Sequence, residues 1–361
     1  MSIFTQCMLA AGLALAVMLL VMPKFLPYLK KLKFGQTIYD LGPQAHKAKQ
    51  GTPNMGGIVI AGGTVLSLVI VAVASAVREG WNLGFSHWLW PLLFVVLGSM
   101  AVGFADDFIK DVKKNHEGLK PKQKLIGQLF VGIGFSLYCY FQVGSDVILP
   151  FTKNTWDLGI FYIPIMTVLV MFMTNSANLQ DGVDGILSSV TVVGMAAFGV
   201  IALLMSEYLD VQAWTAPVQA AFPNGNTVNF LVVSSACFAL VGACIGFLRF
   251  NRHPAKIFMG DTGSMFIGGA MVGAAMLMKL EFLLIPICFT CIMSSVSVMM
   301  QTTYFKITKK KYGQGRRIFK MTPIHHHFEL SGMKENQIVV MYALVTLALS
   351  LIAILSVKGF F

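Results

Sequence analysis

Long apolar stretches separated by short polar segments form the pattern of this chain. About 20 consecutive apolar residues allow a helix to cross a bilayer, and ten stretches reach or approach that length. We therefore predict an all-α polytopic integral membrane protein with ten transmembrane helices, folded as a single transmembrane domain over residues 1–361. The predicted spans are residues 3–22, 56–77, 88–105, 125–142, 158–174, 186–206, 228–248, 263–280, 282–303 and 337–357.

The basic residues lie almost entirely in alternate connections between these spans. All but four of the 27 Lys and Arg side chains fall in one set of connections, and the exceptions are Arg78, Lys153, Lys279 and Lys358. Because positively charged loops stay in the cytoplasm, we place this set inside and both termini outside. The predicted cytoplasmic connections are residues 23–55, 106–124, 175–185, 249–262 and 304–336.

Composition agrees with a membrane protein and narrows its partners. The chain is 56% hydrophobic and 12% charged, whereas soluble domains carry about a quarter charged residues. The net charge is +11, but the charged residues lie between apolar spans. Membrane topology therefore explains them better than nucleic-acid binding, and we expect no nucleic-acid partner. The six cysteines all lie in apolar runs, which favours buried small side chains over a redox or metal-binding role.

Two adjacent carboxylates, Asp106 and Asp107, stand where the third predicted span meets a lysine-rich connection. Ionised side chains at that depth need water, a cation or a partner. Carboxylates beside lysines at a membrane face suit a metal ion held for a phosphorylated substrate. The alternative is an acidic helix end that nearby lysines merely balance.

The third cytoplasmic connection, residues 175–185, contains no positive charge. Asp181 and Asp184 are three residues apart, so a helical turn would put both on one face. With the nearby asparagines they are candidate ligands for a cation, sugar hydroxyls or a nucleobase. A plain Asp-Gly turn is the alternative.

The last two cytoplasmic connections each lead into a predicted helix. We expect Asp261 or Thr262 to cap a helix that opens at Gly263, where phosphate and its counter-cation would be favoured. Thr322-Pro323 predicts a second helix start, just before His325, His326 and His327. Consecutive helical residues point about 100° apart, so one metal ion can hardly bind all three histidines. They suit phosphate binding or proton transfer, or they lie at the interface without a function.

Outside the membrane we predict a short hairpin within residues 143–157 and an interfacial helix or loop over residues 207–224. Neither segment carries recognisable chemistry. In the first cytoplasmic connection, Lys47 and Lys49 are either ligands for an anion or ordinary positive-inside residues.

Five motifs on the predicted cytoplasmic face together resemble the polyprenyl-phosphate N-acetylhexosamine-1-phosphate transferases. The resemblance covers essentially the whole chain, and the Pro-x-His-His-His motif is similar to the muramoyl-pentapeptide branch of that superfamily. Gln180, Val183 and Asn54 depart from the residues usual in the family, while the carboxylates and glycines are kept. The motifs are Lys49 to Gly57, Gly103 to Asp107, Asn178 to Gly185, Phe258 to Ser264 and Pro323 to His327.

The resemblance implies a transfer reaction at a bacterial cytoplasmic membrane. Phospho-MurNAc-pentapeptide would pass from UDP-MurNAc-pentapeptide to the membrane lipid undecaprenyl phosphate, giving lipid I and UMP, in a homodimeric, Mg²⁺-dependent enzyme. A GlcNAc-1-phosphate transferase of the same superfamily is the alternative. A secondary transporter is a remote one, because transporters place charges near the bilayer midplane in repeated halves.

The resemblance also implies roles for individual residues. Asp261, with Asp106 or Asp107, would hold Mg²⁺, and Asp106 would orient or deprotonate the acceptor phosphate. His325 and His326 would act in catalysis on the phosphate or sugar side of the donor. The polyprenyl chain would lie beside a bent ninth helix, which Ser294, Ser295 and Ser297 could help to bend. The implied substrate-binding residues are Lys49, Lys110, Lys122, Asn178, Asp181, Asp184, Asn251, Phe258, Gln301 and His327.

Overall fold

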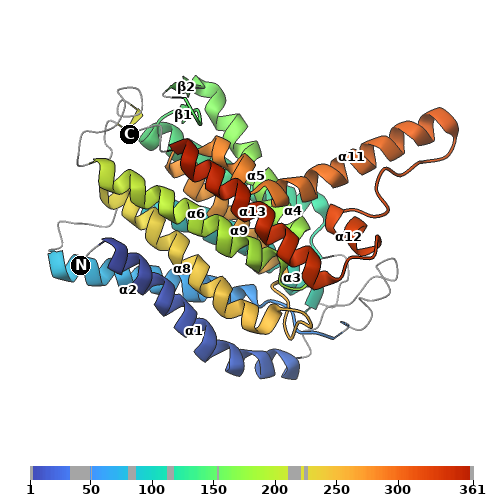
Figure 1. Cartoon of the computed structure of the whole chain (residues 1–361), viewed down its shortest axis with the longest axis horizontal. Coiled ribbons are helices and arrows are strands. Elements are labelled where there is room, and N and C mark those ends of the chain that lie inside the picture. Colours follow the sequence, from blue (N-terminus) through green and yellow to red (C-terminus); the bar gives the residue numbers. More distant parts are fainter. Residues whose placement is uncertain are drawn as a thin grey trace.

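The computed structural model describes residues 3–32, 49, 51–79, 87–111, 118–152, 154–209, 221–222 and 227–357. Nearly all of this part is helical, and the helices pack side by side in one bundle (Figure 1). The helices are α1 (Ile3–Lys31), α2 (Gly57–Glu79), α3 (Leu89–Asp111), α4 (Pro121–Tyr138), α5 (Tyr162–Gln180), α6 (Ile186–Leu209), α8 (Thr227–Asn251), α9 (Gly260–Leu277), α10 (Leu284–Ile287), α11 (Phe289–Tyr312), α12 (Ile324–Glu329) and α13 (Glu335–Val357).

Fewer helices meet the length and apolarity required of a membrane span than the sequence predicts. Each of the ten predicted stretches lies on a helix, but among the described residues eight helices are long and apolar enough to cross a membrane. Residues Glu281–Ile287 and Phe289–Tyr312 form a bent pair that would make a ninth. The helix α9, which matches the predicted span 263–280, is not among them. The structure thus supports eight or nine spans, and the tenth is not established.

The helix α9 differs from the others because it lies at the centre of the bundle. Every residue from Thr262 to Leu277 is buried. Glycines on α9 allow close approach: a Cβ at Gly268 would lie 2.7 Å from the Cα of Thr174 on α5, and one at Gly269 would lie 3.0 Å from the carbonyl oxygen of Val95 on α3. Small residues permit this contact between backbones. The helix is therefore a buried core element, and its glycines lower its mean hydropathy.

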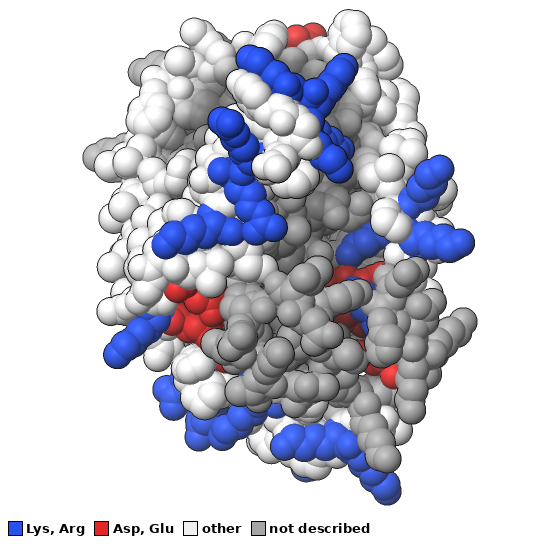
Figure 2. Space-filling model, turned by 90° about the vertical axis from the view of Figure 1, so that its right-hand side faces the viewer, with Lys and Arg blue, Asp and Glu red and all other residues white. Residues whose placement is uncertain are grey.

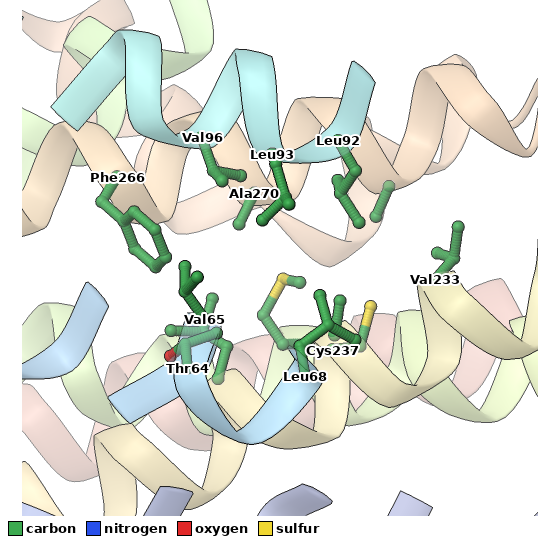
Figure 3. Close-up of a pocket in the computed structure, with 14 residues that line it drawn as sticks. Thr64, Val65, Leu68, Leu92, Leu93, Val96, Val233, Cys237, Phe266 and Ala270 are labelled. Carbon is green, nitrogen blue, oxygen red and sulfur yellow. The ribbon is translucent and has the colours of Figure 1, made fainter. Parts of the chain in front are cut away.

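An apolar crevice separates α2 and α3 next to α9, as Figure 3 shows. Thr64, Val65 and Leu68 line it from α2, and Leu92 and Val96 face them from α3. Its walls are almost entirely carbon, and the one hydroxyl from α2, that of Thr64, already donates to the carbonyl of Ile60 at 2.8 Å. The crevice thus offers no polar chemistry.

The bundle has two distinct ends. The first turns of α1, the last turns of α13 and the hairpin lie at one end, while α12 and the first turns of α13 lie at the other (Figure 1). The predicted hairpin is confirmed: β1 (Asp146–Ile148) pairs antiparallel with β2 (Thr155–Asp157), with Val147 opposite Trp156. Residues 210–220 and 223–224 of the predicted interfacial segment lie outside the described residues.

The ninth predicted helix is bent, but not where the serines stand. The chain turns by 85° at Cys288, between α10 and α11. Pro286, which lacks an N–H and disrupts helical hydrogen bonding, lies two residues earlier. Ser294 donates to the carbonyl of Thr290 at 3.1 Å within a continuous α11, so the prediction that the serines make the bend is wrong.

Candidate active site

Two carboxylates and two lysines meet at the end of the bundle where α3, α4 and α9 come together. We call Asp106, Lys110, Lys124, Asn178 and Asp261 the carboxylate–lysine cluster. The Nζ of Lys110 lies 2.5 Å from Asp106 Oδ2 and 3.3 Å from Asp261 Oδ2. The Nζ of Lys124 lies 2.8 Å from Asp261 Oδ2 and 3.9 Å from Asp106 Oδ2. Asn178 donates to Asp261 Oδ1 at 2.7 Å, so residues from four separate helices converge.

The two carboxylates of this cluster lie against the same two ammonium groups. Asp106 Oδ2 and Asp261 Oδ2 both lie within 4 Å of the Nζ of Lys110 and of the Nζ of Lys124, although the residues are far apart in the chain. Two ionised carboxylates at this distance repel, so they need a proton or a cation between them. Here the ammonium groups of the two lysines supply positive charge. The two lysines thus offset the negative charge of the carboxylate pair.

Asp107 has a different task, because both of its oxygens accept hydrogen bonds from the start of α9. Its Oδ2 accepts from the backbone N–H of Thr262 at 2.8 Å and from the Thr262 hydroxyl at 2.6 Å. Its Oδ1 accepts from the N–H of Asp261 at 3.2 Å and from Asn54 at 3.3 Å. A residue on α3 thus caps α9 from outside and satisfies N–H groups that the helix cannot pair itself.

This capping corrects the predicted start of the helix. The helix α9 begins at Gly260, not Gly263, and its N-cap position is Met259, which makes no side-chain cap. Asp261 therefore lies in the first turn with its carboxylate free to face the lysines. The prediction that Asp261 or Thr262 caps the helix is wrong, because Asp107 performs that role.

Glycines bring the backbones around Asp261 into direct contact. A Cβ at Gly103 would overlap the carbonyl oxygen of Asp261, and one at Gly57 would overlap the backbone of Gly263. Gly260 has φ of 75°, and a Cβ there would lie 2.5 Å from Asp107 Oδ2. Only glycine adopts that φ without strain. These three positions fix how closely α2, α3 and α9 approach each other.

A second polar group ties the other loops together. We call Lys49, Asp184, His253 and Glu335 the loop cluster. The Nζ of Lys49 lies 2.8 Å from Asp184 Oδ1 and 2.7 Å from Glu335 Oε2. His253 Nδ1 lies 3.2 Å from Asp184 Oδ2, which also accepts from the N–H of Ala255 at 2.9 Å. The Asp184 carboxylate and the Lys49 ammonium together thus hold four segments that are distant in sequence.

Asp181 and Asp184 do not share a helical face, contrary to the prediction. The helix α5 ends at Gln180 and α6 begins at Ile186, so both residues lie in the turn between them. Asp184 belongs to the loop cluster, while Asp181 lies near the carboxylate–lysine cluster. Burial and the negative charges of Asp261, Asp107 and Asp184 raise the pKa of Asp181 to about 7.

The other predicted substrate residues differ in whether their side chains already make hydrogen bonds within the protein. Phe258 is half-buried, and its backbone pairs with Pro53 at 2.8 Å and with Gly56 at 2.9 Å. Asn251 donates to the carbonyl of Ile257 at 2.9 Å, and its buried Oδ1 has no partner among the described residues. Gln301 is occupied, because its Oε1 accepts from the N–H groups of Ile318 at 2.9 Å and Phe319 at 3.1 Å.

The three histidines lie on the short helix α12, whose start after Thr322-Pro323 is confirmed. His325 and His326 are buried, and both rings lie against Gly182, between Asp181 and Asp184. His326 Nδ1 lies 3.0 Å from Glu329 Oε2. His327 points elsewhere, and its Nδ1 accepts from the N–H of Lys320 at 3.1 Å. Two of the three histidines thus reach the turn that carries the aspartates.

Sequence reasoning missed three residues of these clusters. Lys124, not the predicted Lys122, approaches Asp261, whereas Lys122 is exposed. His253 and Glu335 complete the loop cluster. Lys124 lies two residues from Lys122, so the signal was present. Glu335 opens α13 and could have been found as an acidic residue in the first turn of a helix.

Metal ligands can be sought in both clusters. Among the residues that the structure describes, one group of three ligating side chains lies within 4.8 Å of each other: Asp184, His253 and Glu335. The ammonium of Lys49 already bonds two of them. Asp106 and Asp261 are contacted by Lys110 and Lys124 in the same way, but they offer oxygen donors only, and oxygen is the donor that Mg²⁺ prefers. Of the two clusters, the carboxylate–lysine cluster therefore matches the ligand preference of Mg²⁺ better.

Charged side chains gather at this end of the molecule. Figure 2 looks onto it and shows Lys and Arg in several groups, with acidic side chains between some of them. The fold and the site together define a class: an all-α polytopic membrane protein with a cluster of carboxylates and lysines at one end of its helix bundle.

Comparisons with known proteins sharpen this class. The model of the family described as glycosyl transferase family 4 matches residues 89–279. The chain is 41% identical over 345 residues to the phospho-N-acetylmuramoyl-pentapeptide-transferase of Thermoanaerobacter sp. (strain X514), covering 95% of this chain and 96% of the relative. It is 38% identical over 339 residues to the protein of the same name from Bacillus subtilis (strain 168), covering 94% of each. The chain therefore belongs to glycosyl transferase family 4, and within it to the phospho-N-acetylmuramoyl-pentapeptide-transferases.

Proposed function

We propose that this protein transfers phospho-MurNAc-pentapeptide from UDP-MurNAc-pentapeptide to undecaprenyl phosphate, giving lipid I and UMP in peptidoglycan synthesis. The relatives that are named for this activity match the chain over nearly their full length. The observation that carries the proposal is the convergence of Asp106 and Asp261 on Lys110 and Lys124. Such a site can bring two phosphorylated substrates together.

The reaction requires two anions to meet. An oxygen of the acceptor phosphate attacks the phosphorus that carries the sugar, a new P–O bond forms, and the P–O bond to UMP breaks. Phosphoryl transfer depends mostly on positioning and charge neutralisation. Lys110 and Lys124 provide fixed positive charge at the carboxylates, and UMP leaves with the electron pair of the broken bond.

Asp106 is the residue we assign to the acceptor. A phosphate monoester has its second pKa near 6, so near pH 7 most of it is already ionised. A strong base is therefore unnecessary, and Asp106 would orient the phosphate or take its last proton. Attack by a carboxylate first, through a covalent aspartyl-phosphate, is the two-step route, and the same residues permit it.

The pair Asp106 and Asp261 would hold Mg²⁺, and the bound ion would neutralise the pyrophosphate of the donor. Asp107 would support this pair by fixing the start of α9. Asn178, which holds Asp261 through its amide, keeps the carboxylate turned toward the lysines. We give this chemistry to the carboxylate–lysine cluster and not to the loop cluster, which includes a histidine nitrogen.

The nucleotide of the donor would lie between Phe258, the loop cluster and Asn251. The ring of Phe258 offers a face for stacking on a base. Asn251 Oδ1, which has no partner among the described residues, would accept a hydrogen bond from the nucleotide. The Lys49 ammonium would donate one, and the Asp184 carboxylate would accept another. Asp181 would contact the ribose side, and His325 and His326 the phosphate or sugar side. Gln301 and His327 would act on the donor indirectly, through the segment that they hold.

The membrane arrangement completes the proposal. The whole chain, residues 1–361, would form a single catalytic domain with ten spans in a bacterial cytoplasmic membrane, counting α9 and the bent helix as spans. Both termini would lie outside and the two clusters at the cytoplasmic face. A homodimer is expected from the family resemblance.

The choice of donor tests the proposal. Purified protein is incubated with undecaprenyl phosphate and either UDP-MurNAc-pentapeptide or UDP-GlcNAc, and released UMP and the lipid product are measured. We expect UMP from the first donor and little from the second. Comparable turnover of UDP-GlcNAc alone would instead assign the chain to GlcNAc-1-phosphate transfer.

A further inference from the structure

The cytoplasmic part of α11 leaves the bundle and projects beyond it (Figure 1). We call residues 299–320, the end of α11 and the segment that returns along it, the α11 projection. The site described above uses none of its charges. Its charge and its exposed apolar residues therefore call for a separate explanation.

Two buried side chains fold the return segment onto α11. Gln301 accepts from the N–H groups of Ile318 and Phe319 and donates to the carbonyl of Phe319 at 3.1 Å. Thr308, which is 3% exposed, accepts from the N–H of Arg316 at 2.8 Å. These contacts bring Arg316 and Arg317 beside the last turn of α11, which carries three lysines.

The resulting end of the projection is strongly positive. Lys306, Lys309, Lys310, Lys311, Arg316 and Arg317 are all exposed. The guanidinium of Arg316 lies 4.6 Å from the ring centre of Tyr312, and the ammonium of Lys311 lies 5.2 Å from it. In the sequence no Asp or Glu stands between Glu281 and Glu329. Nothing within this stretch neutralises the charge.

One face of the same helix is apolar and uncovered. Met299 is 59% exposed, Met300 45%, Tyr304 38% and Ile307 58%. At about 100° per residue, Met299, Met300 and Ile307 lie on the side of α11 away from Gln301 and Thr308, with the exposed Thr303 among them and Tyr304 at the edge of this face. An exposed apolar face on a membrane protein is suited to lipid chains. Along α11, this apolar face precedes the basic end of the projection.

We propose that the α11 projection binds the headgroups of anionic phospholipids at the membrane face that carries the candidate active site. The apolar face lies among the acyl chains, and the lysines and arginines meet the phosphates one or two turns further along the helix. This order matches the order of layers in a leaflet. The positive-inside pattern predicts lysines on this side of the membrane, but the convergence of helix and return segment comes from Gln301 and Thr308.

The test compares lipid binding, not turnover, so it is independent of the proposed function. Wild-type protein in a nonionic detergent is titrated with phosphatidylglycerol or with phosphatidylcholine of the same chains, and bound lipid is counted by native mass spectrometry. The variant Lys309→Gln/Lys310→Gln/Lys311→Gln removes three charges and leaves Gln301 and Thr308 intact. The matched control, Lys24→Gln/Lys30→Gln/Lys31→Gln, removes three exposed charges from the same predicted face at the end of α1.

We expect wild type and the α1 control to prefer phosphatidylglycerol. The α11 variant should lose about ten-fold or more of that preference, because each basic side chain near an anionic surface strengthens binding several-fold. An unchanged preference in the α11 variant contradicts the proposal. An equal loss in the α1 control also contradicts it, since overall charge would then explain the binding.

Discussion

Asp106 and Asp107 are neighbours in the chain, yet their carboxylates make different contacts. Asp106 faces Asp261 and the lysines, and its other oxygen accepts from the N–H of Leu119 at 2.7 Å. Asp107 is enclosed by the start of α9 and is 1% exposed. A helix turns by about 100° per residue, so adjacent side chains can serve two different surfaces.

This difference predicts two phenotypes for equivalent substitutions. Asp106→Asn should lower the maximal rate of transfer at least ten-fold with little change in donor affinity or melting temperature. Asp107→Asn should lower the stability of the fold by about 1 kcal/mol or more, as the loss of a helix cap does. Rates at saturating donor and melting curves of both variants measure this. If Asp106→Asn keeps a normal rate, or if Asp107→Asn leaves the melting temperature unchanged, the respective assignment is wrong.

Two lysines on the first turn of α4 offer a matched pair. Lys124 bonds Asp261, while Lys122 is exposed to solvent. Residues two apart on a helix point roughly 200° apart, so the sequence could not tell which one faces the site.

Lys124→Ala should therefore reduce the rate of UMP release by at least an order of magnitude, and Lys122→Ala should change it less than three-fold. Both variants remove the same side chain from the same turn, so each controls for the other. The reverse order of effects, measured at saturating substrates, would restore Lys122 as the pyrophosphate residue.

At the scale of the elements, α9 shows what a sequence can and cannot reveal. Its apolar residues predict a helix, and the helix is present. Its start was misplaced because the cap comes from Asp107 on another helix, and local sequence carries no sign of that. In the same way, Glu335 and Lys49 meet only because three loops and α13 fold together. Residues that act locally were predictable, and contacts between distant elements were not.

The contact of α3 with α9 depends on Gly103. An added methyl group there would overlap the backbone of Asp261, which cannot move without displacing the whole start of α9. Gly103→Ala should therefore lower the melting temperature by several degrees and abolish transfer. Gly62→Ala on α2 is the control, because a Cβ there meets nothing within 4 Å. Similar melting temperatures for the two variants would contradict the close packing described here.

At the scale of the whole molecule, the alternation of charge predicts which end faces the cytoplasm. The ten predicted stretches all lie on helices, since membrane spans have a strong and local signal. The number of spans remains at eight or nine by length and apolarity, because the buried helix α9 is rich in glycine. Its place among the spans comes from tertiary packing, which hydropathy does not record.

Single cysteines at the two ends test the orientation. The six native cysteines are all buried, so an impermeant maleimide should find few targets in the wild type. Thr152→Cys, in the loop of the hairpin, should react in intact spheroplasts, and Ser331→Cys, after α12, should react only after the membrane is opened. Labelling of Ser331→Cys from outside would reverse the orientation and remove the clusters from the cytoplasmic face.

Asp261 is the central residue of the site, because its carboxylate contacts Lys110, Lys124 and Asn178. The most direct measurement is UMP release from UDP-MurNAc-pentapeptide as a function of Mg²⁺ concentration, for wild type and Asp261→Asn side by side. We predict a saturable dependence on Mg²⁺ in wild type and a rate near background at every concentration in the variant, with its melting temperature retained. A variant that keeps a near-normal, Mg²⁺-dependent rate would contradict the central role of this carboxylate.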